Sequence, residues 1–381
     1  GIRDCLLSRG LGDVYKRQAL SHNTFDTSIY LGVCDKIVPG LVISAATFGF
    51  LPAVFAPAGP MPSGIPNDKK SIVRQKFATG EISRKELMKA EMASYHSPGT
   101  CTFYGTANSN QMLMEFMGLH LPGASFVTPN TPLRTALTEL ATKRALEITS
   151  LGNYFTPAYQ ILDEKAFVNG IVGLMATGGS TNLVLHLPAM AKAAGIKLEI
   201  SDFDDISSVT PLMAKIYPNG LADVNHFHAA GGLNYMIAEL LEAGYLHNDV
   251  QTIMGLGLET YTKEPKLIDG KIEFVPSSTK SHNEKILRPV SNPFQKSGGI
   301  KRLDGNLGSC IIKISSVPME KQIIEAPVRV FEAQEEVKSA FKNNELNTDL
   351  VIVVRFQGLS LIHISEPTRQ EAISYAVFCL K

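Results

Sequence analysis

Two cysteine-containing segments carry side chains that could do chemistry, and the first is Cys34 with its neighbours Asp35 and Lys36. A cysteine thiolate binds soft metals, and an aspartate carboxylate is a hard oxygen ligand that suits Mg²⁺. The triplet follows the apolar residues 29–33, and ligand sites of α/β proteins form where strands end. From spacing alone, a buried cysteine beside a solvated Asp–Lys pair is the favoured interpretation, and a metal site is the alternative.

The second segment runs from His96 to Asn110, is dense in small and polar residues, and contains Cys101. Cys101 lies 67 residues beyond Cys34, so only the fold could bring the two thiols together. Two thiolates are too few to hold a [4Fe–4S] cluster by cysteine alone, although a catalytic cluster can leave one iron open to substrate. The competing interpretation is an ordinary turn-rich loop with a buried cysteine.

A glycine-rich turn precedes the helical pattern that starts at Leu183. It consists of Gly178, Gly179, Ser180, Thr181 and Asn182. Free N–H groups at a helix start suit a phosphate or carboxylate, and Ser or Thr there can cap the helix. The residues match neither a Walker motif nor G-x-G-x-x-G. An anion site and a plain capped helix start are equally supported, and we place His226 and His228 in a polar loop.

The elements that must position these residues alternate between helix and buried strand. Helical spacing of apolar residues predicts helices over Pro132–Ile148, Leu183–Ala194 and Asn234–Ala243. Apolar runs predict strands over residues 29–33 and Leu350–Val354, with a weaker one over Leu51–Phe55. This alternation predicts an α/β fold, with an N-terminal parallel-sheet domain and flanking helices.

The predicted domain organisation has four segments. Residues 1–18 and 359–381 resemble translated linker sequence, so we expect non-native tails there and exclude Cys5 and Cys379. Residues 19–285 form the α/β domain, incomplete at its start. Asp269-Gly270 predicts a hairpin, and short strands follow, with a single helix over Glu335–Lys342. Residues 286–358 are therefore expected to begin a β-rich C-terminal domain that is truncated.

Composition excludes several classes of protein. The 381 residues include 36 Lys+Arg and 36 Asp+Glu, so the formal charge is zero and a nucleic-acid binder with a basic field is disfavoured. No uninterrupted apolar run of about 18 residues occurs, so we expect no membrane span. The five cysteines are scattered, which fits a reducing cytoplasm better than a secreted disulfide scaffold.

Four motifs resemble the dihydroxy-acid and phosphogluconate dehydratase family, over roughly residues 19–358. They are LGVCDKIVPGL (Leu31–Leu41), PGTCTFYGTANSNQM (Pro98–Met112), TGGSTN (Thr177–Asn182) and LDGNLGS (Leu303–Ser309). Within the family, SHNTFD (Ser21–Asp26), SYHSPGTCTFYGTAN (Ser94–Asn108) and YPNGLADVNHF (Tyr217–Phe227) are most similar to the 6-phosphogluconate branch.

The resemblance implies an iron–sulfur cluster, [4Fe–4S] in this branch, with Cys34 and Cys101 as ligands. In the sister branch, the residues matching Asp35 and Lys36 bind Mg²⁺, the lysine as a carbamate, and whether they do so here stays open. The implied reaction removes water from 6-phospho-D-gluconate, a phosphorylated sugar acid, to give 2-dehydro-3-deoxy-6-phosphogluconate in the Entner–Doudoroff route.

The resemblance also implies that some functional residues of the family have no counterpart in this chain. The family's upstream acidic ligand and its candidate base, a downstream serine, have no counterpart here, so we expect the chain as given to be nearly inactive. The intact enzyme is expected to be a homodimer. Alternatives are a dehydratase for dihydroxy-acids or other sugar acids, and a non-catalytic metal- or anion-binding α/β protein. We predict that Cys34 and Cys101 converge and that Gly178–Asn182 faces the same site.

Overall fold

The structure is a computed structural model that describes residues 18–306, 308–317, 321–355 and 376–380. It divides into two compact units, one within Tyr15–Ser316 and the other within Val317–Lys381. Both units combine helices with parallel strands, which confirms the predicted α/β class. The boundary that we expected near residue 286 remains a prediction, as do the tails, most of whose residues lie outside the described ones.

A β–α–β element opens the first unit. Strand β1 (Ser28–Gly32) pairs in parallel with β2 (Ala53–Pro57), in a register from Ser28↔Ala53 to Gly32↔Pro57. Helix α2 (Ile37–Thr47) makes the crossover, and most of its residues are buried. The predicted second strand begins two residues late, because Pro52 has no N–H for the ladder and its carbonyl accepts from Ser28.

Helices fill most of the first unit. The predicted helices are confirmed as α6 (Pro132–Glu147), α9 (Leu183–Ala193) and α12 (Gly232–Glu242). The others are α5 (Thr106–Phe116), α7 (Ala158–Ile161), α8 (Glu164–Thr177), α10 (Ile200–Val209), α11 (Val224–Ala229) and the short 3₁₀ helix η1 (Glu259–Thr262). Helix α5 packs against α8 and touches α2 and α9, which places it in the centre of the unit.

Two of these helices correct the sequence analysis. Helix α5 begins inside the segment predicted as a loop, and Ala107–Phe116 are all buried although four of them are Asn, Ser or Gln. Polar composition suggested a loop because the hydrogen bonds that satisfy these side chains come from distant segments. His226 and His228 lie in α11 and not in a loop, because Asp223 caps that helix by accepting from the His226 N–H.

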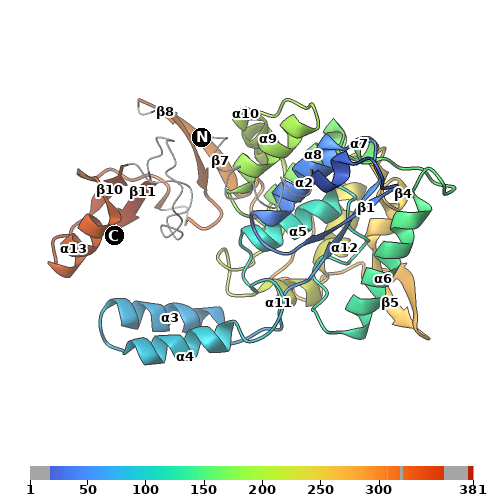
Figure 1. Ribbon diagram of the computed structural model, residues 1–381. Coiled ribbons are helices and arrows are strands. Elements are labelled where there is room, and N and C mark those ends of the chain that lie inside the picture. The colour runs from blue at the N-terminus through green and yellow to red at the C-terminus, as the bar shows by residue number, and fades with distance from the viewer. Residues whose placement is uncertain (1–17, 307, 318–320, 356–375, 381) are drawn as a thin grey trace. The chain divides into compact units, whose positions relative to one another are not determined.

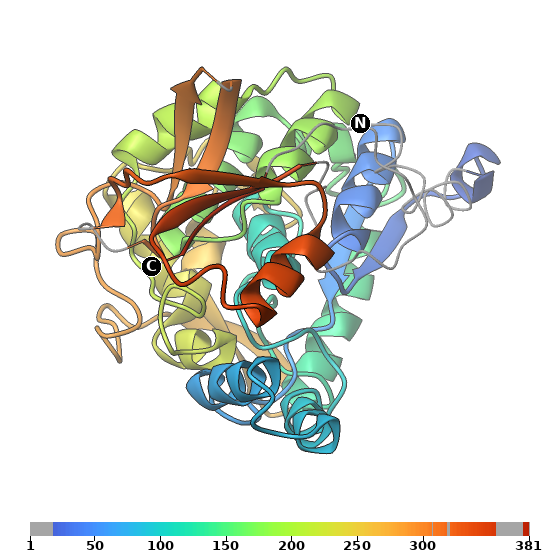
Figure 2. The same ribbon diagram turned by 90° about the vertical axis from the view of Figure 1, so that its left-hand side faces the viewer.

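A helical hairpin, called the arm below, extends from the first unit beside α11 (Figures 1 and 2). It consists of α3 (Asn67–Ala78) and α4 (Arg84–Ser94). Ser83 and Glu86 form a reciprocal capping box at the start of α4. The Arg74 guanidinium donates to both Glu91 oxygens, at 2.8 and 3.2 Å, and so ties the two helices together.

Three antiparallel hairpins follow the helices of the first unit. They are β3 (Gln251–Thr252) with β4 (Gly255–Leu256), β5 (Lys263–Ile268) with β6 (Lys271–Pro276), and β7 (Ile300–Gly305) with β8 (Gly308–Lys313). The predicted Asp-Gly turn is confirmed: Asp269 and Gly270 have φ of 48° and 74°, as a type I′ turn requires. Strand β7 packs on α10.

The second unit repeats the β–α–β arrangement. Strand β9 (Val328–Phe331) pairs in parallel with β10 (Leu350–Val354) after a crossover through α13 (Gln334–Lys342). Strand β11 (Ala376–Leu380) adds to β10 in the antiparallel direction. The predicted strands and helix of this region are thus confirmed. No helix among the described residues is long and apolar enough to cross a membrane.

Candidate functional site

The first cysteine loop joins the carboxyl end of β1 to the start of α2. Cys34 is exposed, and its Sγ lies 3.7 Å from the Asp35 carboxylate. Lys36 occupies the N-cap position of α2. Two side chains of α5 hold the loop through its backbone: Gln111 donates to the Gly32 carbonyl at 3.2 Å, and Asn110 donates to the Asp35 carbonyl at 2.7 Å.

The second cysteine loop is attached to the continuation of β2. The Thr100 N–H donates to the Gly59 carbonyl at 2.9 Å, and the Met61 N–H donates to the Thr100 carbonyl at 3.0 Å. This parallel bridge fixes Cys101 just beyond the carboxyl end of β2. The structure therefore brings both cysteines to the same edge of the parallel sheet, which is where α/β proteins build their sites.

Asn108 of α5 holds the Cys101 loop and is fully buried. Its amide donates to the carbonyls of Cys101, at 2.6 Å, and Phe103, at 2.9 Å, while its oxygen accepts from the Thr100 hydroxyl at 2.8 Å. Asn108, Asn110 and Gln111 thus attach both cysteine loops to one helix. Sequence reasoning missed this role, and the available signal was the group of amide side chains that begins seven residues after Cys101.

The two thiols are electrostatically coupled. Burial, and then the charge of Cys34, raise the pKa of the Cys101 thiol to about 11. Burial is also the largest cause that raises the pKa of Cys34, and the Asp35 carboxylate adds to it. Because negative groups around each thiol disfavour its thiolate, a bound cation would reverse this effect.

Two side chains of the site, Cys34 and Cys101, suit a metal cofactor as ligands. The coupled thiols, with Asp35 beside them, form a donor set that suits a soft metal or an iron–sulfur cluster. Asn110 Oδ1 and Gln111 Oε1 are buried acceptors that have no hydrogen-bond partner among the residues that the structure describes. Within the described residues, however, no group of three or more His, Cys, Asp or Glu side chains is arranged to hold a metal ion.

The glycine turn at Gly178–Asn182 touches the same helix. The hydroxyls of Ser180 and Thr106 lie 2.8 Å apart, and the Asn182 amide donates to Thr106 Oγ1 at 2.9 Å. The Ser180 N–H donates to the Ser109 hydroxyl at 3.0 Å. A side chain on Gly179 would clash here, since its Cβ would lie 2.7 Å from Leu174 Cδ1 and 3.0 Å from Ser109 Oγ.

The backbone of this turn differs from the expectation. We expected free N–H groups, but those of Gly178, Gly179, Ser180 and Asn182 already have partners, which are Met175 O, Leu174 O, Ser109 Oγ and Ser180 Oγ. Within the described part of the chain, no side chain caps α9 either. The expected row of unpaired amides was therefore wrong. Binding of an anion here would depend on the half-buried side chains of Ser180, Thr181 and Asn182.

One lysine of the arm acts electrostatically on Cys101. Lys70, in the first turn of α3, is half-buried, and burial lowers its pKa while the charges of Asp223 and Cys101 raise it. The same coupling stabilises the thiolate of Cys101. Sequence analysis did not single out Lys70, because nothing in a charged helix distinguishes one lysine from the next.

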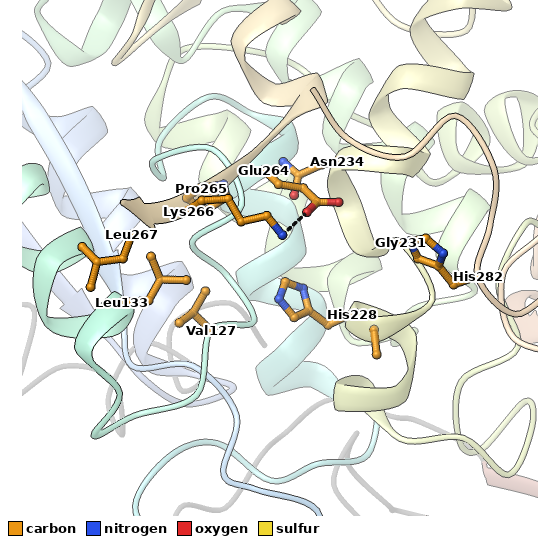
Figure 3. A pocket seen from close by; sticks show the side chains of 11 residues that line it. Val127, Leu133, His228, Gly231, Asn234, Glu264, Pro265, Lys266, Leu267 and His282 are labelled. Carbon is orange, nitrogen blue, oxygen red and sulfur yellow. Dashed lines mark ion pairs between the residues drawn. The ribbon is translucent and has the colours of Figure 1, made fainter. Parts of the chain in front are cut away.

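A separate cavity of about 360 Å³ lies between α11, α12 and β5 (Figure 3). His228 and the Lys266–Glu264 ion pair, whose Nζ–Oε2 distance is 3.0 Å, line it. Burial lowers the pKa of His228. None of the predicted cofactor or substrate residues lines this cavity.

Two family models match most of the chain. Residues 1–261 match the dihydroxy-acid/6-phosphogluconate dehydratase N-terminal family model, and residues 285–367 match the C-terminal one. The chain is 58% identical over 359 residues to a phosphogluconate dehydratase of Rhizobium meliloti, and 53% identical over 358 residues to that of Escherichia coli K12. A dihydroxy-acid dehydratase of Caldanaerobacter subterraneus is 32% identical over 367 residues.

The coverage of these matches is unequal. Each comparison includes 94% of this chain, but only 59% of the two phosphogluconate dehydratases and 63% of the dihydroxy-acid dehydratase. The chain thus spans about three fifths of the length of the curated relatives that it matches. The family models together match most of the chain, and the chain belongs to the dihydroxy-acid/6-phosphogluconate dehydratase family.

Proposed function

We propose that this chain is part of a hydro-lyase that dehydrates 6-phospho-D-gluconate to 2-dehydro-3-deoxy-6-phosphogluconate. The observation that carries the proposal is the attachment of both cysteine loops to α5 at the carboxyl edge of the sheet. Identity of 51–58% to relatives named phosphogluconate dehydratase, against 32% to a dihydroxy-acid dehydratase, supports the phosphogluconate substrate. A dihydroxy-acid or other sugar-acid substrate is the second candidate.

We propose Cys34 and Cys101 as cysteine ligands of a [4Fe–4S] cluster. When bound, such a group supplies a Lewis acid that stabilises negative charge on substrate oxygens. Asp35 and Lys36, directly after the first ligand, are proposed as the residues that would hold Mg²⁺ if the site takes that ion instead. The chain's own contribution is to fix the two loops through the buried amides of α5.

Substrate binding is proposed at the Gly178–Asn182 turn. Gly179 allows the close approach of this turn to Ser109 of α5, and Gly178 lies against Asn219. The side chains of Ser180, Thr181 and Asn182 supply polar groups for a phosphate or carboxylate. Asn219 supports the turn by donating to the Gly178 carbonyl at 3.0 Å. The described residues include no group that we assign as the base.

The cofactor proposal is tested by anaerobic reconstitution of the chain with iron and sulfide. We expect bound iron and visible iron–sulfur absorbance in the unchanged chain, and loss of both in C34S and C101S. The matched control is C310S, because Cys310 is an exposed free thiol on β8. Equal iron in C34S, C101S and C310S would refute the assignment.

The substrate proposal is tested in the protein extended to the length of its relatives. Keto-acid formation should be faster from 6-phosphogluconate than from a branched dihydroxy-acid, and the reverse order would favour the second candidate. A metal-loaded protein that dehydrates neither would favour the non-catalytic alternative. We also propose a homodimer, to be measured by sedimentation, and a cytoplasmic location, since Cys34, Cys101 and Cys310 are free thiols.

A further inference from the structure

One loop is bonded to both the second cysteine loop and the glycine turn. This bridging loop, residues 217–224, leads into α11. Its Tyr217 carbonyl accepts from the Tyr104 N–H at 2.8 Å, and its Val224 N–H donates to the Thr102 carbonyl at 2.8 Å. Both partners belong to the second cysteine loop. The two ends of the bridging loop are therefore fixed to the backbone that carries the second thiol.

Asn219, inside the bridging loop, connects it to the glycine turn. The Asn219 amide donates to the Gly178 carbonyl at 3.0 Å. The two residues are in close contact, because a Cβ on Gly178 would collide with Asn219 Nδ2. A carbonyl oxygen can only accept a hydrogen bond, so the amide nitrogen must face Gly178 and the orientation of the side chain is unambiguous.

Two serines hold the other end of the same amide. The hydroxyls of Ser315 and Ser316 donate to Asn219 Oδ1 at 3.2 and 2.6 Å. The Ser315 N–H donates to the Gly299 carbonyl at 3.3 Å. Gly299 itself lies against the turn, since its Cβ would be 3.5 Å from Gly178 Cα. The amide of Asn219 is thus fixed at both ends, and its bond to Gly178 has a defined direction.

The glycine turn has a separate attachment to α5. Ser180 contacts the Thr106 hydroxyl at 2.8 Å and donates from its N–H to the Ser109 hydroxyl at 3.0 Å. These bonds do not involve Asn219. Without the Asn219 amide the turn should still form, but its Gly178 end would lose the donor that ties it to the bridging loop. The distance between the turn and the second cysteine loop would then be less well defined.

We infer that Asn219 is a positioning residue, which sets the glycine turn relative to the second cysteine loop without contact to the substrate. This inference rests on the proposed function, in which the turn binds the sugar acid. A displacement of about 1 Å between a bound substrate and the reacting groups can cost about 100-fold in rate. N219A should therefore lower kcat by about 10- to 100-fold. KM should change little, because the side chains of Ser180, Thr181 and Asn182 remain.

The test is steady-state kinetics of the protein extended to the length of its relatives, with N219A, N219D and the control N248A. N219D keeps the acceptor for both serines but has no proton for the Gly178 carbonyl, so its kcat should fall as far as that of N219A. The amide of Asn248 also donates and accepts, to Glu259 and from the Leu258 N–H, and these bonds involve neither the turn nor a cysteine loop. N248A should keep its kcat.

Amide hydrogen exchange of the chain as given supplies a readout that does not depend on activity. Exchange over residues 176–184 should be faster in N219A than in the unchanged chain, and N248A should leave it unchanged. Iron bound after anaerobic reconstitution should be the same in all three proteins, because Asn219 touches neither Cys34 nor Cys101.

The outcomes separate this inference from the proposed function. If the unchanged extended protein dehydrates no acid, the proposed function fails and the inference fails with it. If that protein is active and N219A or N219D keeps its kcat, the inference alone fails, even where the Tm of the variant has fallen. A raised KM with an unchanged kcat would assign Asn219 to substrate binding and would overturn it as well. So would equal hydrogen exchange, or a loss of iron with normal kcat per loaded protein.

Discussion

Replacing Asn108 by alanine removes three hydrogen bonds at once, to Thr100 Oγ1, Cys101 O and Phe103 O. The side chain is fully buried, so water does not easily replace it. At about 1 kcal/mol for each bond, N108A should lower the free energy of unfolding by about 3 kcal/mol. N108D should be at least as harmful, because a carboxylate would face the Cys101 and Phe103 carbonyls without a proton to donate.

The assay is urea denaturation combined with alkylation of the thiols at a fixed pH. We expect a lower urea midpoint for N108A with an unchanged slope, and faster alkylation of Cys101 under native conditions. The control is N153A, at an exposed asparagine with no hydrogen bond among the described contacts, which should change stability by less than about 0.5 kcal/mol. If N108A unfolds like N153A and Cys101 reacts no faster, α5 does not hold the cysteine loop as described.

Further predictions concern other parts of the chain. G179V should destabilise the protein by about 1–3 kcal/mol, measured by thermal unfolding, because its Cβ would lie 2.7 Å from Leu174 Cδ1. In the protein extended to the length of its relatives, G179V should also raise KM. An unchanged KM would count against the turn as a substrate site. E91Q should cost only about 0.2–1 kcal/mol, since Arg74 and Glu91 are 51% and 34% exposed, and the cost should shrink in high salt. Burial raises the pKa of Glu115 above 4.5, so the stability from its protonated form is present below that pH and lost as the pH rises through the raised pKa. The free energy of unfolding of E115Q should therefore increase relative to that of the unchanged chain as the pH rises through this range. A difference between the two unfolding free energies that stays constant across pH would refute this.

Sequence reasoning succeeded where the pattern is local. The apolar spacing over Pro132–Ile148 predicted α6, the β-branched run Leu350–Val354 predicted β10, and Asp269-Gly270 predicted the hairpin. Each of these signals depends on neighbours within one element, so no knowledge of the tertiary structure is needed.

It failed where the stabilising partner is distant in sequence. Helix α5 was read partly as a loop, because the partners of Asn110 and Gln111 lie 75 and 79 residues away. The arm gave no apolar pattern, because many of its residues are charged and exposed. The amides of the Gly178–Asn182 turn were expected to be free because their acceptors could not be seen from the sequence. Two cysteines and their order were visible, but the helix that holds them was not.

The parallel bridge between Pro60 and Thr100 fixes the two ends of the intervening segment, which contains the arm, next to each other. The geometry at the thiols consequently does not depend on the length of that segment. A version with a short turn in place of the arm could keep Cys34 and Cys101 where they are, while it would lose Lys70. Attachment of the cysteine loops to α5 would then be unaffected by the arm, and relatives could differ in the length of this segment without any change at Cys34 and Cys101.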